Sequence, residues 1–104
     1  MMTTIEILGR KNIITYGERS PADVGMGRAN SGEDKIWIWN GLSHDGKRET
    51  LLHEILHQIS EYADLDLTEQ QVSILGIALN LLKMNPQETI IPESISTEGV
   101  SDET

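Results

Sequence analysis

The chain opens with two short runs of β-branched and aliphatic residues. These runs cover residues 5–8 and 13–16, and a polar segment with one glycine, residues 9–12, lies between them. Two β-rich runs joined by four turn-forming residues predict a β-hairpin. Residues 17–34 follow and are rich in Gly, Pro, Asp and Ser, with neither helical nor strand periodicity. We therefore predict a long irregular connection there.

The third predicted strand covers residues 35–39, in which Ile36 and Ile38 alternate with two tryptophans, Trp37 and Trp39. Successive side chains of a strand point to opposite faces, so the isoleucines share one face and the tryptophans share the other. Both faces are apolar. Either this strand is sandwiched between two layers, or one face covers something other than the core.

Two helices are predicted after residue 43. The first is capped by Ser43 or Asp45, and its apolar stripe comprises Leu52, Ile55, Leu56, Ile59 and Ala63. The second begins at a capping box formed by Thr68 and Gln71 and ends before Pro86, and its apolar stripe comprises Val72, Leu75, Leu79 and Leu82. A short loop between helices implies an antiparallel pair. The predicted fold class is α+β, a small three-stranded sheet packed on two antiparallel helices.

Length and charge suggest one small domain followed by an acidic tail. The chain has 104 residues and a net charge of -9. Residues 85–104 contain five acidic residues and no Lys or Arg, so we predict a disordered tail after a domain at residues 1–84. A domain of this size has a limited core, and a bound metal or self-association would stabilise it.

Composition also limits the partners and the location. The strongly negative charge argues against nucleic acid as a partner. We see neither a signal peptide nor a stretch that could span a membrane, so we expect a cytoplasmic protein. The absence of cysteine excludes disulfides and thiolate ligands, so any metal must be held by His and carboxylate side chains.

The motif His-Glu-Ile-Leu-His at residues 53–57 is the strongest functional feature. Histidines four residues apart on a helix lie one turn from each other, so their imidazoles can converge on one metal ion. Glu54 is turned about 100° round the helix and lies within reach of a metal-bound water. We predict that His53 and His57 bind Zn²⁺ and that Glu54 is the general base. The alternative is two solvent-facing histidines on an ordinary amphipathic helix.

Catalytic zinc sites usually have three protein ligands and one open position. His44, the only other histidine, precedes the motif and is expected on the surface. A metzincin would have a glycine and a ligand at the positions that Ser60 and Ala63 occupy, so that class is excluded. The remaining candidates are carboxylates downstream of the motif: Glu61, Asp64, Asp66 and Glu69.

Glu69 is the favoured third ligand. Glu61 lies about 12 Å along the helix from the first histidine, and the two aspartates lie in the turn just past the helix, where the chain would have to double back. Glu69 opens the second helix, and Val72 and Gly76 share its face. Gly76 would let this face approach the first helix closely. One of the aspartates, or a site without a third protein ligand, remains the alternative.

Three segments resemble short phage and prophage zinc metallopeptidases, relatives of the ImmA/IrrE group and of minimal gluzincins. They are residues 50–57 (Thr-Leu-Leu-His-Glu-Ile-Leu-His), residues 67–72 (Leu-Thr-Glu-Gln-Gln-Val) and the helix end at residues 85–86 (Asn-Pro). The resemblance covers about residues 30–86. It implies a minimal zincin-like core in a protein of the bacterial host cytoplasm. The implied zinc ligands are His53, His57 and Glu69, with Glu54 as general base.

The resemblance also implies a substrate site. The strand at residues 35–39 would be the sheet edge along which a peptide pairs, and the substrate-binding residues would be Ile36, Trp37 and Ile38. Two features depart from the family. The glutamate helix is a loose match, and no residue stands out for stabilising an oxyanion, although three aromatic or imidazole side chains are candidates: Tyr16, Tyr62 and His44.

The sequence therefore predicts a zinc-dependent peptidase that acts on a peptide or protein, with no membrane partner and with self-association as an option. The alternative is a non-catalytic phage or prophage regulatory or interaction module in which zinc links two helices of an undersized domain. A purely structural site has no need of Glu54 beside His53, whereas hydrolysis does. This difference favours the enzyme.

Overall fold

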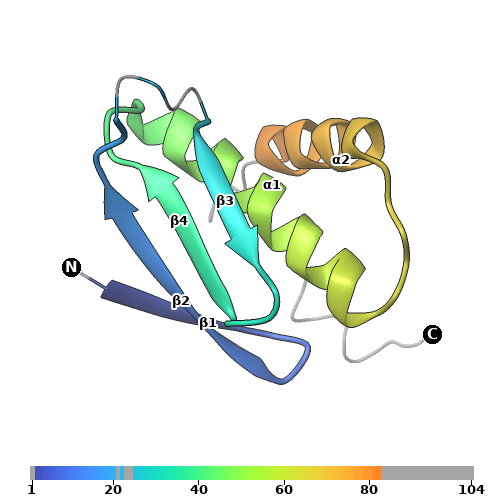
Figure 1. Cartoon of the computed structure of the whole chain (residues 1–104). Coiled ribbons are helices and arrows are strands. Elements are labelled where there is room, and N and C mark those ends of the chain that lie inside the picture. Colours follow the sequence, from blue (N-terminus) through green and yellow to red (C-terminus); the bar gives the residue numbers. More distant parts are fainter. Residues whose placement is uncertain (1, 21, 23–24, 83–104) are drawn as a thin grey trace, which may run out of the picture.

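The computed structural model describes residues 2–20, 22 and 25–82 of the chain. Its elements are, in order, β1 (Met2–Ile7), β2 (Arg10–Gly17), β3 (Gly27–Asn30), β4 (Lys35–Trp39), α1 (His44–Tyr62) and α2 (Glu69–Leu81). The strands form one sheet in the order β1-β2-β4-β3, in which β2 and β4 are parallel and the other neighbours are antiparallel. Helix α1 lies across one face of this sheet and α2 packs on α1 (Figure 1). The α+β prediction is confirmed, with four strands rather than three.

The hairpin of β1 and β2 has a two-residue turn, so the predicted four-residue loop is wrong. Ile7 pairs with Arg10, and the turn residues Leu8 and Gly9 have φ angles of 50° and 82°. Positive φ at both turn positions matches the twist of the flanking strands. The polar residues after Gly9 therefore extend β2 instead of forming a loop.

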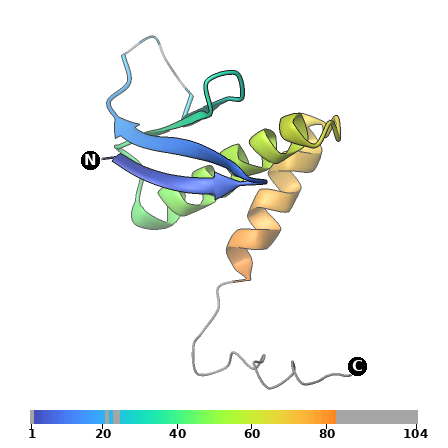
Figure 2. The same ribbon diagram turned by 90° about the horizontal axis from the view of Figure 1, so that it is seen from below.

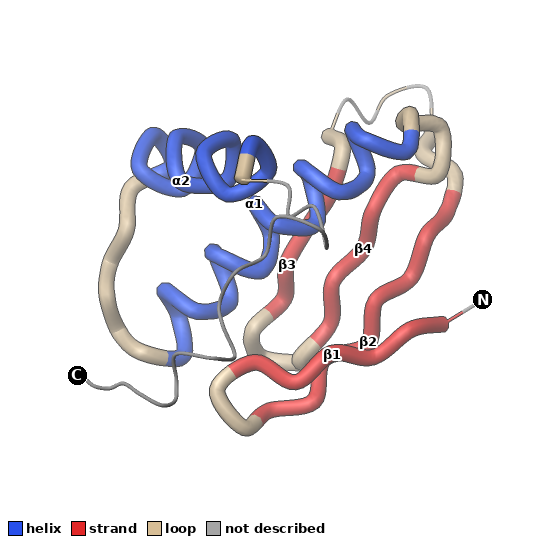
Figure 3. Tube along the Cα trace, turned by 180° about the vertical axis from the view of Figure 1, so that it is seen from behind, coloured by secondary structure: helices blue, strands red, loops and turns tan. Residues whose placement is uncertain are grey.

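The predicted irregular connection contains a strand, β3, which the sequence analysis missed. It pairs antiparallel with β4 from Gly27 opposite Ile38 to Asn30 opposite Lys35. Its sequence, Gly-Arg-Ala-Asn, has no β-branched residue, so only the ladder with β4 identifies it. Figure 3 shows β3 at the border of the sheet, where it runs beside α1.

The core lies between the sheet and α1. Its buried members come from three strands, and aliphatic side chains of α1 pack against them: Ile7, Ile14, Ile36 and Ile38 from the sheet, with Leu51, Ile55 and Ile59 from the helix. On the opposite face, guanidinium groups cover the tryptophans, with Arg19 3.5 Å above the Trp39 ring centre and Arg28 5.2 Å from that of Trp37. One apolar face of β4 therefore forms the core, and cations cover the other.

Both helix starts follow the predicted capping chemistry. Gly46 donates its backbone N–H to the Ser43 side chain at 3.0 Å, which selects Ser43 as the cap of α1. At α2, the Gln71 backbone N–H donates to Thr68 Oγ1 at 3.1 Å, and the Thr68 backbone N–H donates to Gln71 Oε1 at 2.8 Å. The predicted capping box is confirmed.

The predicted apolar stripe of α2 is mostly wrong. Val72 is buried, but Leu75, Leu79 and Leu82 are exposed, and the buried residues are Val72, Gly76 and Asn80. Residues 72, 76 and 80 are spaced by four, so one narrow ridge of α2 faces α1. The chain of α2 returns along α1 in the opposite direction with crossed axes (Figures 1 and 2). Among the described elements α2 packs on α1 and on none of the strands.

A buried polar network fixes α1 on the sheet. Gln58 Nε2 donates to Asn12 Oδ1 at 2.6 Å, and both side chains are fully buried. One turn further on, the Tyr62 hydroxyl donates to Asp34 Oδ1 at 2.6 Å. Burial, followed by this hydrogen bond, raises the pKa of Tyr62 above its ordinary value, so the hydroxyl remains a donor. These bonds set the rotation of α1 about its axis.

Replacement of Gln58 tests this anchor. We expect Gln58→Ala to lower the free energy of unfolding by about 2–3 kcal/mol, because the buried Asn12 Oδ1 loses its shorter hydrogen bond and keeps only the Tyr62 hydroxyl, 3.2 Å away. Gln70→Ala is the matched control, since Gln70 is exposed on α2, and its effect should stay within about 0.5 kcal/mol. Urea unfolding followed by circular dichroism measures both. Equal destabilisation of the two variants would contradict the anchoring role.

Candidate metal centre

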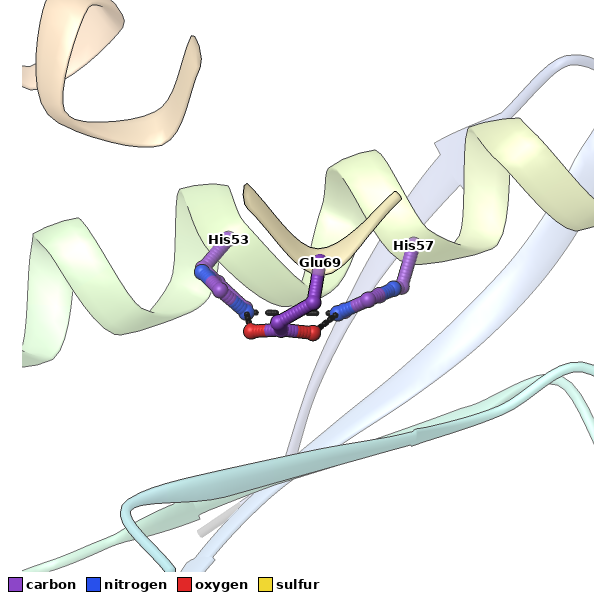
Figure 4. Close-up of side chains that lie close together, drawn as sticks. All are labelled: His53, His57 and Glu69. Atoms are coloured by element: carbon purple, nitrogen blue, oxygen red, sulfur yellow. Dashed lines mark hydrogen bonds and ion pairs between the residues drawn. The ribbon is translucent and has the colours of Figure 1, made fainter. Parts of the chain in front are cut away.

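The two motif histidines converge at one point on the side of α1. His53 and His57 lie one helical turn apart, and their Nε2 atoms are 3.2 Å from each other (Figure 4). Their ring centres are 4.9 Å apart with an interplanar angle of 66°. Both rings therefore direct the same nitrogen to a shared position, as the spacing of the motif predicts.

Glu69 completes the group from the first turn of α2. Its Oε2 lies 2.9 Å from His53 Nε2 and its Oε1 lies 3.0 Å from His57 Nε2, so one carboxylate spans both imidazoles (Figure 4). These three residues form the one group of described His, Asp and Glu side chains that could hold a metal ion. The alternatives Glu61, Asp64 and Asp66 do not belong to it.

The ligand-atom spacing fits a small divalent ion. In a tetrahedral site with bonds of roughly 2.0–2.1 Å, neighbouring ligand atoms lie about 3.3 Å apart. Here the two Nε2 atoms are 3.2 Å apart, and each lies 2.9 or 3.0 Å from one of the two Glu69 carboxylate oxygens. Two imidazoles and one carboxylate are a frequent donor set for catalytic zinc, with a fourth position left open. The residues present therefore fit a metal by both geometry and chemistry.

A buried serine positions α2 for this contact. Ser60 is buried near the end of α1, and its Oγ accepts the Leu67 backbone N–H at 2.9 Å. Its carbonyl accepts the Leu65 N–H, also at 2.9 Å. Asp64 and Asp66 adopt left-handed φ angles of 56° and 57°, which aspartate tolerates better than most residues. This role of Ser60 could not be predicted from the sequence, because a single serine in a helical stripe carries no periodicity signal.

Gly76 lies where α2 passes close to the α1 backbone. A Cβ atom at this position would meet the His53 backbone, with the Cα atom 3.5 Å away and the N atom 3.6 Å away. The prediction that the face of Val72 and Gly76 looks at α1 is confirmed. These distances are ordinary van der Waals contacts, so the space admits a methyl group but no larger side chain.

Glu54 lies buried beside the histidines. Its side chain contributes to α1's inner face and is only 7 % exposed. Burial raises the pKa of Glu54 above its ordinary value, His53 and His57 lower it, and Glu69 raises it. The strand β3 passes close to Glu54, because a Cβ atom on Gly27 would lie 3.2 Å from Glu54 Cγ. A glycine at this position lets the strand approach the carboxylate.

A cleft of about 730 Å³ surrounds the group. Its walls are β3, one face of α1 and one side of α2 as far as Ile77, with lining residues that include Gly27, Arg28, Ala29, Glu54, Glu61 and Ser73. Apart from the two histidines, the ionisable side chains of this lining are four glutamates and one arginine. The cleft lies along β3, and the outer edge of β3 pairs with no other strand of the described sheet.

The predicted position of the substrate strand is wrong. β4 is an inner strand paired with both β2 and β3, so its backbone is not a free edge. Ile36 and Ile38 are buried in the core, and Trp37 faces the opposite side of the sheet under Arg28. None of the three lines the cleft, so their assignment as substrate-binding residues is withdrawn. The edge strand at the site is β3.

The other polar candidates lie elsewhere. His44 and Tyr16 line a second pocket, near Lys47 and Arg48, and Tyr62 belongs to the network that anchors α1. The described lining of the cleft contains no tyrosine and no third histidine, and Arg28 is its only cation.

Comparison of the chain with protein families, with curated proteins and with solved structures gives no match. No helix in the described part of the chain has the length and apolar character needed to cross a bilayer. The predicted tail, residues 85–104, lies outside the described residues.

We expect metal binding to depend on the three converging side chains. Elemental analysis of protein prepared without chelator should show that His57→Ala and Glu69→Gln each hold roughly a tenth of the wild-type metal or less, because two remaining ligands bind too weakly. Glu61→Gln is the matched control, because Glu61 lines the cleft without joining the group. Metal content equal to wild type in His57→Ala would disprove the site, and in Glu69→Gln would remove only that ligand.

Substitutions of Gly76 test the helix approach. Gly76→Ala should keep the metal and stabilise the fold by up to about 1 kcal/mol, because alanine is the better helix former and its methyl group fits. Gly76→Leu should push α2 away from His53 and lower metal affinity. Thermal unfolding and metal titration of both variants provide the measurement. If Gly76→Leu bound metal like wild type, α2 would not need this close contact.

Proposed function

We propose that this protein is a zinc-dependent peptidase. The observation that carries the proposal is a buried carboxylate, Glu54, directly beside two imidazoles and a carboxylate that converge on one point. A metal held for structural purposes gains nothing from a second, buried glutamate at the same place. Hydrolysis, by contrast, needs a base of this kind next to the ion.

The residues divide into ligands and a base. His53, His57 and Glu69 would hold Zn²⁺, and when bound the ion would supply Lewis acidity to the carbonyl of the scissile peptide bond. Glu54 then takes a proton from the attacking water on its carboxylate and passes it to the leaving amine. Burial raises the pKa of Glu54. A higher pKa makes the carboxylate a stronger acceptor for the proton of the water, and it brings the pKa of Glu54 closer to that of the leaving amine.

The cleft suggests how a peptide would bind. The outer edge of β3 is unpaired within the described sheet, and it borders the cleft close to Glu54. An extended peptide can add to such an edge as a further strand through backbone hydrogen bonds. We propose that a peptide or protein substrate lies along Gly27 to Asn30. Among substrates, this arrangement favours unfolded segments over compact domains.

The short phage and prophage metallopeptidases that the motif segments resemble provide the family for this proposal. The motif at residues 53–57 and Glu69 at the start of the next helix support it, because the two helices bring these segments to one cleft. We accordingly propose action in the cytoplasm of a bacterial host.

A structural zinc site is the second candidate, and one observation favours it. Among the described elements α2 packs only on α1, so a metal held by Glu69 and the two histidines would link the helices directly. The described cleft lining also lacks a tyrosine or a third histidine that could stabilise an oxyanion. In this case the domain serves regulation or interaction, and the metal contributes folding free energy.

Glu54→Gln separates the two candidates. We expect this variant to keep its zinc and to cleave peptides at least about 100-fold more slowly than wild type, because the amide cannot accept the proton. A fluorogenic peptide library provides the substrates, and Glu61→Gln, in the same cleft, is the matched control with unchanged activity. Zinc content is measured on the same samples.

Two results would contradict the peptidase. Equal cleavage by wild type and Glu54→Gln, with zinc bound to both, would show that Glu54 is not the base. If neither protein cleaves any peptide and chelation lowers the melting temperature sharply, zinc has the structural role.

A further inference from the structure

The exposed side of α2 is apolar to an extent that no other described surface matches. Six large aliphatic side chains at its end are between 39 % and 74 % exposed: Ile74, Leu75, Ile77, Leu79, Leu81 and Leu82. We call this set the α2 face. Between Glu69 and Lys83 the sequence contains no charged residue. Figures 1 and 2 show the α2 ribbon on the side of α1 away from the sheet, and the exposed fractions of these side chains show that the α2 face is not part of the core.

The burial of α2 is inverted relative to an ordinary surface helix. Such a helix turns its aliphatic stripe to the core and its polar side chains to water. Here the residues turned to α1 are Val72, Gly76 and Asn80, and the larger aliphatic residues point outward. Asn80 is held in this position by the Arg48 guanidinium, whose Nε donates to Asn80 Oδ1 at 2.9 Å. Rotation of α2 to bury its leucines would break this contact and remove Glu69 from the histidines.

We propose that the α2 face is the interface of a homodimer, in which two copies of α2 pack across a two-fold axis. Ile74, Ile77 and Leu81 recur at intervals of three and four residues and form a ridge that can interlock with its own copy. Two copies of the face would bury on the order of 1,000 Å² in total, the lower limit for a specific interface. The inference does not depend on the proposed peptidase activity.

The lack of charged side chains on the α2 face limits what can bind there and leaves a second copy as a suitable occupant. Each chain carries a net charge of -9, so two copies repel one another over most of their surfaces. The α2 face contains no ionised side chain and is therefore a place where identical chains can meet. An anionic membrane surface would require Lys or Arg on the helix, and α2 has neither. A partner recognised by charge would likewise find nothing on this face to pair with.

The oligomeric state of the full chain tests the proposal. Sedimentation velocity and light scattering between 1 and 100 µM, all approximate loading values, should show wild type as a dimer that dissociates on dilution. Ile74→Glu and Leu81→Glu should each weaken the dimer at least about 100-fold, since a carboxylate would be buried without a partner. Leu8→Glu is the matched control, because Leu8 is equally exposed in the β1–β2 turn, and it should dimerise like wild type.

Disulfide formation tests the two-fold arrangement even if the glutamate variants fail to fold. The chain has no cysteine, so a single introduced cysteine reports only on its own copy. Ala78 lies near the middle of the α2 face and is exposed. Ala78→Cys should form a disulfide-linked dimer on mild oxidation, whereas Leu8→Cys should form no disulfide-linked dimer.

Three outcomes would overturn the proposal. Wild type that stays monomeric at the highest concentration, together with stable glutamate variants, would show that the α2 face serves a different partner. Monomeric wild type with strongly destabilised variants would show that the chain's own remaining residues cover the face. A dimer that survives both glutamates and gives no Ala78→Cys cross-link would place the interface elsewhere on the molecule.

Discussion

The rotation of α1 about its own axis is the constraint on which the rest of the structure depends. Three adjacent faces of this helix have separate tasks: Leu51, Ile55 and Ile59 fill the core, His53 and His57 meet α2, and Glu54 lies under β3. A small turn of the helix would misplace all three at once. The buried bond from Gln58 to Asn12 prevents this, since neither side chain has access to water as a substitute partner.

Features that depend on local physics could be predicted from the sequence. Alternation identified the strand at residues 35–39, and residues that commonly cap helices identified the starts of both helices. The spacing of His53 and His57 fixed their convergence, because four residues make about one helical turn. Placing Glu69 opposite them required one further step, the inference that the face of Gly76 looks at α1, and the structure brings these residues together.

Features that depend on distant pairing could not be predicted. β3 has the sequence Gly-Arg-Ala-Asn, which has no strand preference of its own, and it is a strand because β4 supplies its ladder. Without β3, residues 35–39 looked like the sheet edge, and Ile36, Trp37 and Ile38 were predicted to bind substrate there, whereas β4 is an inner strand. The predicted apolar stripe of α2 was wrong for a related reason. Hydrophobicity marks which residues avoid water, but it does not reveal whether the same chain or another one covers them.

The position of Glu69 links the metal centre to the α2 face. Without an ion, the Glu69 carboxylate in the first turn of α2 is stabilised by the helix dipole and by its contacts of 2.9 and 3.0 Å with the two imidazoles. An ion held by all three side chains would tie the start of α2 to α1, while a second copy would bury the other end of the same helix. Both events stabilise one placement of α2, so their free energies are coupled. By linkage, whatever dimerisation adds to metal affinity, metal binding must add to dimerisation.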